Sequence, residues 1–156
     1  MKLAVGDPAP DFTLLDHNGN EVMLSGLKGS MVVLYFYPKD NTPGCTTEAC
    51  DFRDNMARIT SAGATVLGVS GDSMISHQKF REKFDLPFPL LVDEDHAVME
   101  AYGAWGEKKL YGKIFQGLIR STFLIDRAGN IANAWYNVRA KGHVDTVLAA
   151  LEKLKP

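Results

Sequence analysis

The chain has 156 residues, of which 46% are hydrophobic and 23% charged, and its formal net charge is −2. These values are typical of one globular domain and exclude disordered, fibrous and strongly basic nucleic-acid-binding classes. No apolar run reaches the roughly 20 residues that cross a bilayer, and residues 1–8 lack the apolar segment of a signal peptide. We therefore expect one domain over residues 1–156 that is located in the cytoplasm and binds neither a membrane nor nucleic acid.

Hydrophobic periodicity predicts alternating strands and helices. Continuous apolar runs rich in β-branched and aromatic residues indicate strands covered on both faces, whereas apolar residues spaced by three and four indicate helices. In chain order the expected elements are a strand at 31–37, a loop at 38–44, a helix from 45 that ends at 63, a strand at 64–70, a helix at 73–84, a strand at 88–92, a helix at 94–102, strands at 121–126 and 131–136, and a helix at 143–154.

This order of elements predicts an α/β fold of the thioredoxin-like type. Its central mixed β-sheet would be flanked by helices, and residues before the first predicted strand would form an N-terminal extension. Residues 103–117 show little periodicity, so we expect them to form a long loop. Loops of this length in a compact domain are often functional.

The cysteine count also limits the possible functions. Cys45 and Cys50 are the only two cysteines, whereas a secreted disulfide scaffold would carry more. In a reducing compartment a close pair indicates redox chemistry or metal binding rather than a permanent disulfide. The histidines are scattered and match no zinc-ligand pattern, so we expect neither a metal nor another cofactor. They are His17, His77, His96 and His143.

Cys45 stands at the point where a predicted strand and loop give way to a helix. Free N–H groups and the positive end of the helix dipole would face its sulfur, which favours the reactive thiolate. Before it, Pro43 removes one N–H and Gly44 allows the backbone to approach a ligand closely. The hydroxyl of Thr42 can donate a hydrogen bond to an attacked oxygen. These features favour a nucleophilic cysteine over a small buried hydrophobe.

Cys50 follows five residues later in the same predicted helix. In a regular helix the two Cα atoms would be roughly 8–9 Å apart and the side chains would point about 140° apart. A disulfide requires Cα atoms within about 7 Å, so a bond between the two cysteines would require the helix to unwind. On spacing alone, Cys50 can equally be a half-buried helical residue without a role.

The run Pro38-Lys-Asp-Asn-Thr-Pro-Gly-Cys-Thr-Thr-Glu-Ala-Cys50 resembles the active site of peroxiredoxins. It is most similar to the bacterioferritin comigratory protein subgroup, also called peroxiredoxin Q. The similarity covers nearly the whole chain and includes the opening residues 6–14 and the segments 68–80, 86–88, 105–113 and 120–126.

The resemblance implies roles for individual residues. Cys45 would be the peroxidatic cysteine, Thr42 and Arg120 would hold the peroxide oxygens and the thiolate, and Pro38 would shield the sulfur. Cys50 would be the resolving cysteine. Without the resemblance, Arg120 would be taken for a solvated surface residue.

Glu48 lies three residues after Cys45 and is placed to orient the guanidinium of Arg120. An acidic residue in the first turn of a helix also has a simpler explanation, because it is favoured by the helix dipole. With Pro38, Pro43 and Gly44, it completes the set of residues expected around the substrate pocket.

The expected reaction is thiol-dependent reduction of hydrogen peroxide and alkyl hydroperoxides. Cys45 would become a sulfenic acid, Cys50 would convert it to an intramolecular disulfide, and thioredoxin would reduce that disulfide. The subgroup is usually monomeric. Two alternatives remain: a one-cysteine peroxidase resolved by an external thiol, and a thioredoxin-fold redox sensor or holdase.

Overall fold

The computed structural model describes residues 2–154, apart from the side chain of Leu110. The strands are β1 (Thr13–Asp16), β2 (Glu21–Met23), β3 (Met31–Phe36), β4 (Ala64–Ser70), β5 (Leu90–Val92), β6 (Trp105–Leu110), β7 (Lys113–Leu118), β8 (Ser121–Ile125) and β9 (Ile131–Trp135). The helices are the 3₁₀ turn η1 (Leu24–Leu27), α1 (Pro43–Asp54), α2 (Met56–Ser61), α3 (Met74–Phe84), α4 (Ala97–Ala101) and α5 (His143–Lys153). None of the helices within residues 2–154 is long and apolar enough to cross a membrane.

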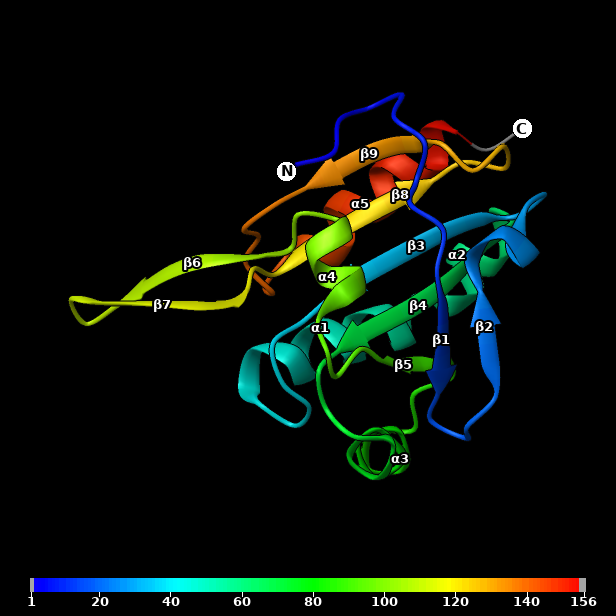
Figure 1. Cartoon of the computed structure of the whole chain (residues 1–156). Coiled ribbons are helices and arrows are strands. Elements are labelled where there is room, and N and C mark those ends of the chain that lie inside the picture. Colours follow the sequence, from blue (N-terminus) through cyan, green and yellow to red (C-terminus); the bar gives the residue numbers. More distant parts are fainter. Residues whose placement is uncertain (1, 155–156) are drawn as a thin grey trace.

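Seven strands form one mixed sheet in the order β2-β1-β5-β4-β3-β8-β9 (Figure 1). β3 pairs in parallel with β4 and antiparallel with β8, and β4 pairs in parallel with β5. All six residues of β3 are buried, which explains why its sequence is a continuous apolar run. Because β3 and β4 run in the same direction, their carboxyl ends lie at the same edge of the sheet. The loops that lead into α1 and α3 begin there.

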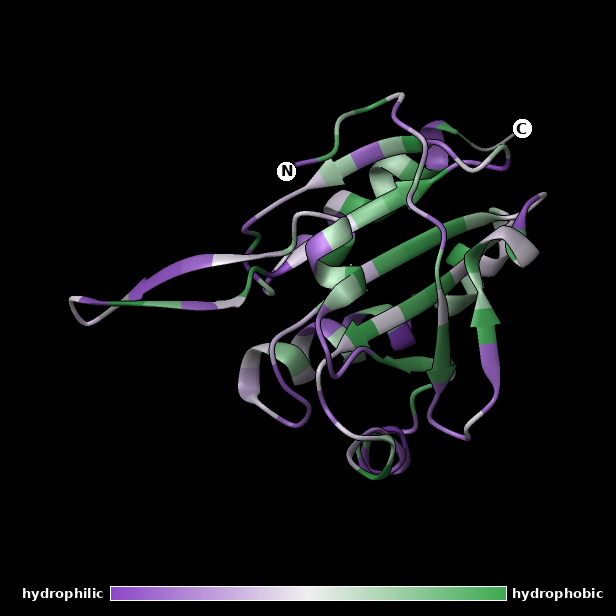
Figure 2. Ribbon diagram, viewed as in Figure 1, coloured by the Kyte–Doolittle hydropathy of each residue, from purple (hydrophilic) through white to green (hydrophobic). Residues whose placement is uncertain are grey.

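Two apolar layers cover the two faces of this sheet. Alternate residues of β3, such as Val33 and Tyr35, pack in one cluster with α1, α2, α3 and α5. The intervening residues, such as Leu34 and Phe36, pack with α4 and the N-terminal segment. Figure 2 shows the corresponding concentration of hydrophobic residues along the central strands. The N-terminal extension, including β1, β2 and η1, therefore helps to close the second layer.

The helix predicted from residue 45 to 63 is two helices. α1 begins earlier, at Pro43, because Thr42 has an extended backbone and proline is favoured at the first helical position. The break falls at Asn55, whose backbone leaves the helical region with φ −112° and ψ 11°. Its side-chain amide donates to the carbonyl of Asp51 at 2.8 Å, and such local side-chain bonds compete with helix continuation.

The loop predicted at 103–117 is wrong. Residues in this range form β6 and β7, an antiparallel hairpin that makes its own two-stranded sheet and projects from the body of the protein (Figure 1). Its two-residue turn consists of Tyr111 and Gly112, with positive φ values of 52° and 76°, as hairpin turns require. A half-buried strand would alternate charged and apolar residues, whereas β6 carries consecutive charged residues. That composition explains why periodicity did not indicate a strand.

Candidate functional site

Cys45 occupies the first turn of α1, directly beyond the carboxyl end of β3. Its side chain is buried, with 1% relative exposure. The first hydrogen bond within the helix runs from the N–H of Thr46 to the carbonyl of Thr42 at 2.8 Å. The amides of Gly44 and Cys45 therefore have no acceptor within the helix. The local environment of the sulfur is that of a positive helix end, as the sequence predicts.

Arg120 brings a cation to this sulfur from a distant part of the chain. It lies in the short connection between β7 and β8, 75 residues after Cys45. Its Nη2 donates a hydrogen bond to Cys45 Sγ at 3.3 Å, and its Nη1 donates to Glu48 Oε1 at 2.7 Å. A Cβ atom at Gly44 would lie 3.3 Å from Nη2, so glycine at this position leaves room for the guanidinium.

Glu48 is fully buried beneath Arg120. Burial raises the pKa of its carboxyl to about 7, and the nearby Arg120 offsets part of that effect. Burial acts against the charge of Arg120, but Glu48 and Cys45 outweigh it and raise the pKa of the guanidinium. Arg120 is therefore a permanent cation that favours the thiolate form of the sulfur beside it.

Cys50 lies on the same helix but in a different environment. It is half-buried, and both cysteines are free thiols in the described structure. Burial raises the pKa of the Cys50 thiol, so less of it is thiolate at neutral pH. Cys50 is therefore a weak nucleophile in this environment.

The remaining residues predicted for the pocket lie around the start of α1, with varying contact to the sulfur. Thr42 Oγ1 donates to the carbonyl of Lys39 at 2.9 Å, so its hydroxyl is bonded within its own loop. Pro38 and Pro43 are exposed on that loop and at the first helical position. Within residues 2–154, none of these three side chains is hydrogen-bonded to Cys45.

A buried anchor of the loop before α1 was not predicted from the sequence. Asp40 accepts hydrogen bonds from the hydroxyl of Tyr37 at 2.5 Å and from that of Ser76 at 2.8 Å, and its Oδ2 lies 2.7 Å from His77 Nδ1. The other ring nitrogen of His77 lies 2.8 Å from the carbonyl of Leu91. These contacts hold the loop before α1 against α3 and β5. They join distant segments, so no local pattern indicates them.

The same anchor contains three side chains with metal-ligating atoms. Ligand atoms of Asp40, Asp72 and His77 lie within 4.8 Å of one another. Asp72 Oδ2 accepts from the backbone N–H of Asp40 at 2.8 Å and from the hydroxyl of Ser70 at 2.6 Å. Because hydrogen bonds already engage these atoms, the arrangement is explained as an anchor for the loop.

His143, at the start of α5, is a buried neighbour of the site. Its Nε2 shares a hydrogen bond with Thr122 Oγ1 at 2.8 Å. Burial, with a smaller effect of Arg120, lowers the pKa of His143 to about 4 from an ordinary value of 6.5. As pH falls from 6.5 to 4, the unfolded chain therefore gains a proton that the folded chain does not.

We expect this difference to reduce the free energy of unfolding by on the order of 2 kcal/mol as pH falls through that window. A His143→Gln variant lacks the titrating ring, so it should lack this part of the pH dependence. Urea unfolding of both proteins between pH 7 and pH 4 measures it. A difference in stability between the two proteins that stays constant with pH would contradict the assignment.

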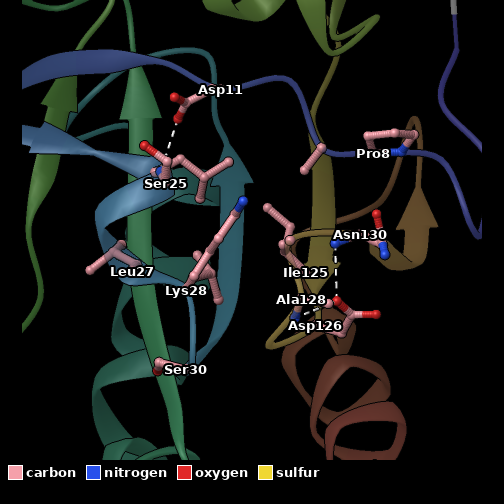
Figure 3. A pocket seen from close by; sticks show the side chains of 14 residues that line it. Pro8, Asp11, Ser25, Leu27, Lys28, Ser30, Ile125, Asp126, Ala128 and Asn130 are labelled. Atoms are coloured by element: carbon pink, nitrogen blue, oxygen red, sulfur yellow. Dashed lines mark hydrogen bonds between the residues drawn. The ribbon is translucent and has the colours of Figure 1, made fainter.

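A separate pocket of about 250 Å³ lies at the opposite end of β3 (Figure 3). Its wall includes Ser30, Lys28 and Asp126. Asp126 accepts hydrogen bonds from the backbone N–H groups of Ala128 and Asn130, both at 3.0 Å. Neither cysteine lines this pocket, so it is separate from the candidate site at the other end of β3.

Comparison with known proteins agrees with this geometry. The sequence profile of the AhpC/TSA family matches residues 5–134. Peroxiredoxin Bcp of Bacillus subtilis is 49% identical over 154 residues, which cover 99% of this chain and 98% of that protein. Peroxiredoxin Bcp of Escherichia coli is 46% identical over 151 residues, 97% of both chains.

Two solved structures have the same arrangement of elements. The bacterioferritin comigratory protein of Xanthomonas campestris is 43% identical, with a TM-score of 0.89 over 93% of this chain and 92% of its own. A mutant PrxQ of Xylella fastidiosa is 37% identical, with a TM-score of 0.93 over 100% and 99%. The thioredoxin-like fold and the resemblance drawn from the active-site motif are confirmed. The chain belongs to the AhpC/TSA family and is a peroxiredoxin of the bacterioferritin comigratory protein, or peroxiredoxin Q, group.

Proposed function

We propose that this peroxidase uses Cys45 as the nucleophile that attacks hydrogen peroxide and alkyl hydroperoxides. The observation that carries the proposal is the hydrogen bond from Arg120 to the buried sulfur at the start of α1. The Xanthomonas campestris relative is described by its alkyl peroxide reduction activity, which supports the substrate class.

In the first step the thiolate displaces the leaving oxygen of the peroxide and becomes a sulfenic acid, while water or an alcohol departs. Arg120 and the free amides of the first turn stabilise the negative charge that develops on the leaving oxygen. Thr42 would add a donor if its hydroxyl turned from Lys39 toward the substrate. Pro38, Pro43 and Gly44 shape the approach. All of this chemistry is carried by protein groups.

In the second step Cys50 condenses with the sulfenic acid to form a disulfide. Both cysteines lie in α1, so the first turns of that helix must unwind before the sulfurs can meet. A dithiol protein, thioredoxin in our proposal, then reduces the disulfide by exchange. Such a cycle requires a reducing compartment such as the cytoplasm.

We propose that the chain works as one domain and as a monomer. Cys45, Cys50, Arg120 and Glu48 come from one chain, so the reaction needs no residue from a second copy. Sedimentation of the reduced and oxidised protein tests this assembly state. A stable dimer that contributes side chains to the site would overturn it.

Oxidation by one equivalent of peroxide tests the two-cysteine cycle. We expect a monomer two hydrogens lighter, with Cys45 and Cys50 in one cross-linked peptide in non-reducing mass analysis. Amide exchange should increase around residues 45–50, because the disulfide is incompatible with the helix. A persistent sulfenic acid or an intermolecular dimer would instead favour the one-cysteine cycle.

The redox-sensor alternative makes a different kinetic prediction. A sensor or holdase would oxidise once and turn over little peroxide, whereas the proposed enzyme should consume peroxide continuously when thioredoxin, its reductase and NADPH are supplied. Measuring NADPH oxidation under these conditions separates the two functions. Stoichiometric consumption that stops after one equivalent would support the sensor.

A further inference from the structure

In the described structure, the site has two acidic groups, the Cys45 thiol and the Glu48 carboxyl, that share one cation, Arg120. The guanidinium of Arg120 donates one hydrogen bond to Cys45 Sγ and another to Glu48 Oε1. Cys45 is 1% exposed and Glu48 is 0% exposed. If both acids were ionised, the buried group of three would carry a net charge of −1. If one of them keeps its proton, the group is neutral.

The second oxygen of Glu48 favours one of the two acids as the holder of that proton. Oε2 is buried and, within residues 2–154, receives no hydrogen bond. The buried hydroxyl of Tyr35 likewise has no hydrogen-bond partner in the part of the chain that the structure describes. An ionised carboxylate with an unsatisfied buried oxygen is more costly than a neutral acid, because burial penalises charge more strongly than polarity.

Among the described residues that act on this group, none supplies a second positive charge at neutral pH. The titratable groups that act on Glu48 or on its partner Arg120 are Tyr35 from β3, Cys45 and Asp51 from α1, Arg120 itself, and His143 from α5. Burial raises the pKa of Tyr35 far above 10 and lowers the pKa of His143 to about 4, so both are neutral near pH 7. Asp51 adds only negative charge. Two acids that share one cation cannot both ionise easily.

We propose that Glu48 holds a proton while Cys45 is a thiolate, and gives that proton up as the sulfur becomes a sulfenic acid. The inference rests on the proposed role of Cys45 as the nucleophile. The balanced step is Cys45–S⁻ + ROOH + Glu48–COOH → Cys45–SOH + ROH + Glu48–COO⁻. The sulfur is oxidised, the O–O bond is broken, and the proton balances the leaving alkoxide.

Arg120 would then face one anion before and after the reaction. The thiolate is its partner in the reduced state, and the Glu48 carboxylate is its partner once the sulfur is neutral. The pKa of about 7 for Glu48 supports this exchange, because such a carboxyl can hold or release a proton near neutral pH. Glu48 is therefore a positioning and proton-holding residue, since no contact places it on the substrate.

Proton uptake during the first peroxide reaction tests the proposal. The experiment uses Cys50→Ser protein, so that the reaction stops at the sulfenic acid with α1 folded. At pH 7 in weak buffer with an indicator dye, we expect almost no proton uptake from solvent per Cys45 oxidised. Adding Glu48→Gln should raise the uptake to one proton per Cys45, because the amide accepts the Arg120 hydrogen bond but has no proton to release.

Infrared difference spectra give a readout that a purely orienting role would not change. Oxidation should remove a protonated carboxylic acid C=O band in the Cys50→Ser protein, and this loss should be absent after Glu48→Gln. Asp51→Asn is the matched control, because Asp51 lies on the same helix; in it the band should still be lost.

Two results distinguish failure of the Glu48 inference from failure of the proposed function. If peroxide oxidises Cys45 but both proteins take up one proton and no acid band is lost, Glu48 was already ionised and this inference is overturned while the nucleophile assignment stands. If peroxide leaves Cys45 unmodified, the proposed function fails first.

Discussion

Replacing Cys45 by serine should abolish peroxide consumption and leave the fold intact. Serine is almost the same size, so the buried position at the start of α1 can accept it. Its hydroxyl does not ionise near neutral pH, and Arg120 would have no sulfur anion to pair with. We expect turnover to fall by at least about 10³-fold, as is usual when a nucleophile is removed. NADPH-coupled peroxide assays measure turnover, and circular dichroism with thermal unfolding measures the fold.

Cys50→Ser provides the comparison for this prediction. Cys50 is not bonded to Arg120, so its replacement should leave the first reaction with peroxide nearly unchanged. It should instead prolong the sulfenic acid and make over-oxidation easier. A Cys45→Ser protein that retained most of its turnover would remove Cys45 from the role of nucleophile, whatever the behaviour of Cys50.

The central part of the fold could be predicted because burial determines its composition. β3 and β4 are covered on both faces, and their continuous apolar sequences indicate this burial directly. The start of α3 is also set by a local contact, because Ser73 Oγ accepts from the N–H of Ser76 and serine is a favoured residue at this position. The hairpin of β6 and β7 was not predicted because it is exposed. Its strands carry no alternation of buried and solvated residues.

The candidate site likewise has one part that could be predicted from the sequence and another that could not. The placement of Cys45 depends on the elements immediately beside it. The loop, the proline, the glycine and the start of the helix could therefore be predicted from the sequence. Arg120 reaches the sulfur from 75 residues away, through the antiparallel pairing of β3 with β8. Only the family resemblance connected the two. The anchor between Asp40 and His77 joins residues 37 positions apart; both lie in segments covered by the resemblance, but the resemblance assigned neither of them a role.

Replacing Arg120 by alanine should slow peroxide attack by about 10²–10³-fold, the range typical of losing one donor to a developing charge. Two effects combine. The thiolate loses the cation that is hydrogen-bonded to it, so a smaller fraction of Cys45 is ionised at neutral pH. The leaving oxygen also loses a donor. Stopped-flow peroxide kinetics measure the first step, and the rate of alkylation against pH measures thiolate formation.

Arg120→Lys separates charge from geometry. Lysine keeps a positive charge but cannot donate from a planar fork to Cys45 and Glu48 at once. If charge alone matters, the lysine variant should alkylate like the wild type and attack peroxide at nearly its rate. If the bidentate geometry matters, alkylation should recover more fully than peroxide attack, because only the latter needs a correctly aimed donor. Unchanged alkylation and peroxide kinetics in Arg120→Ala would show that the bond to sulfur has no part in catalysis.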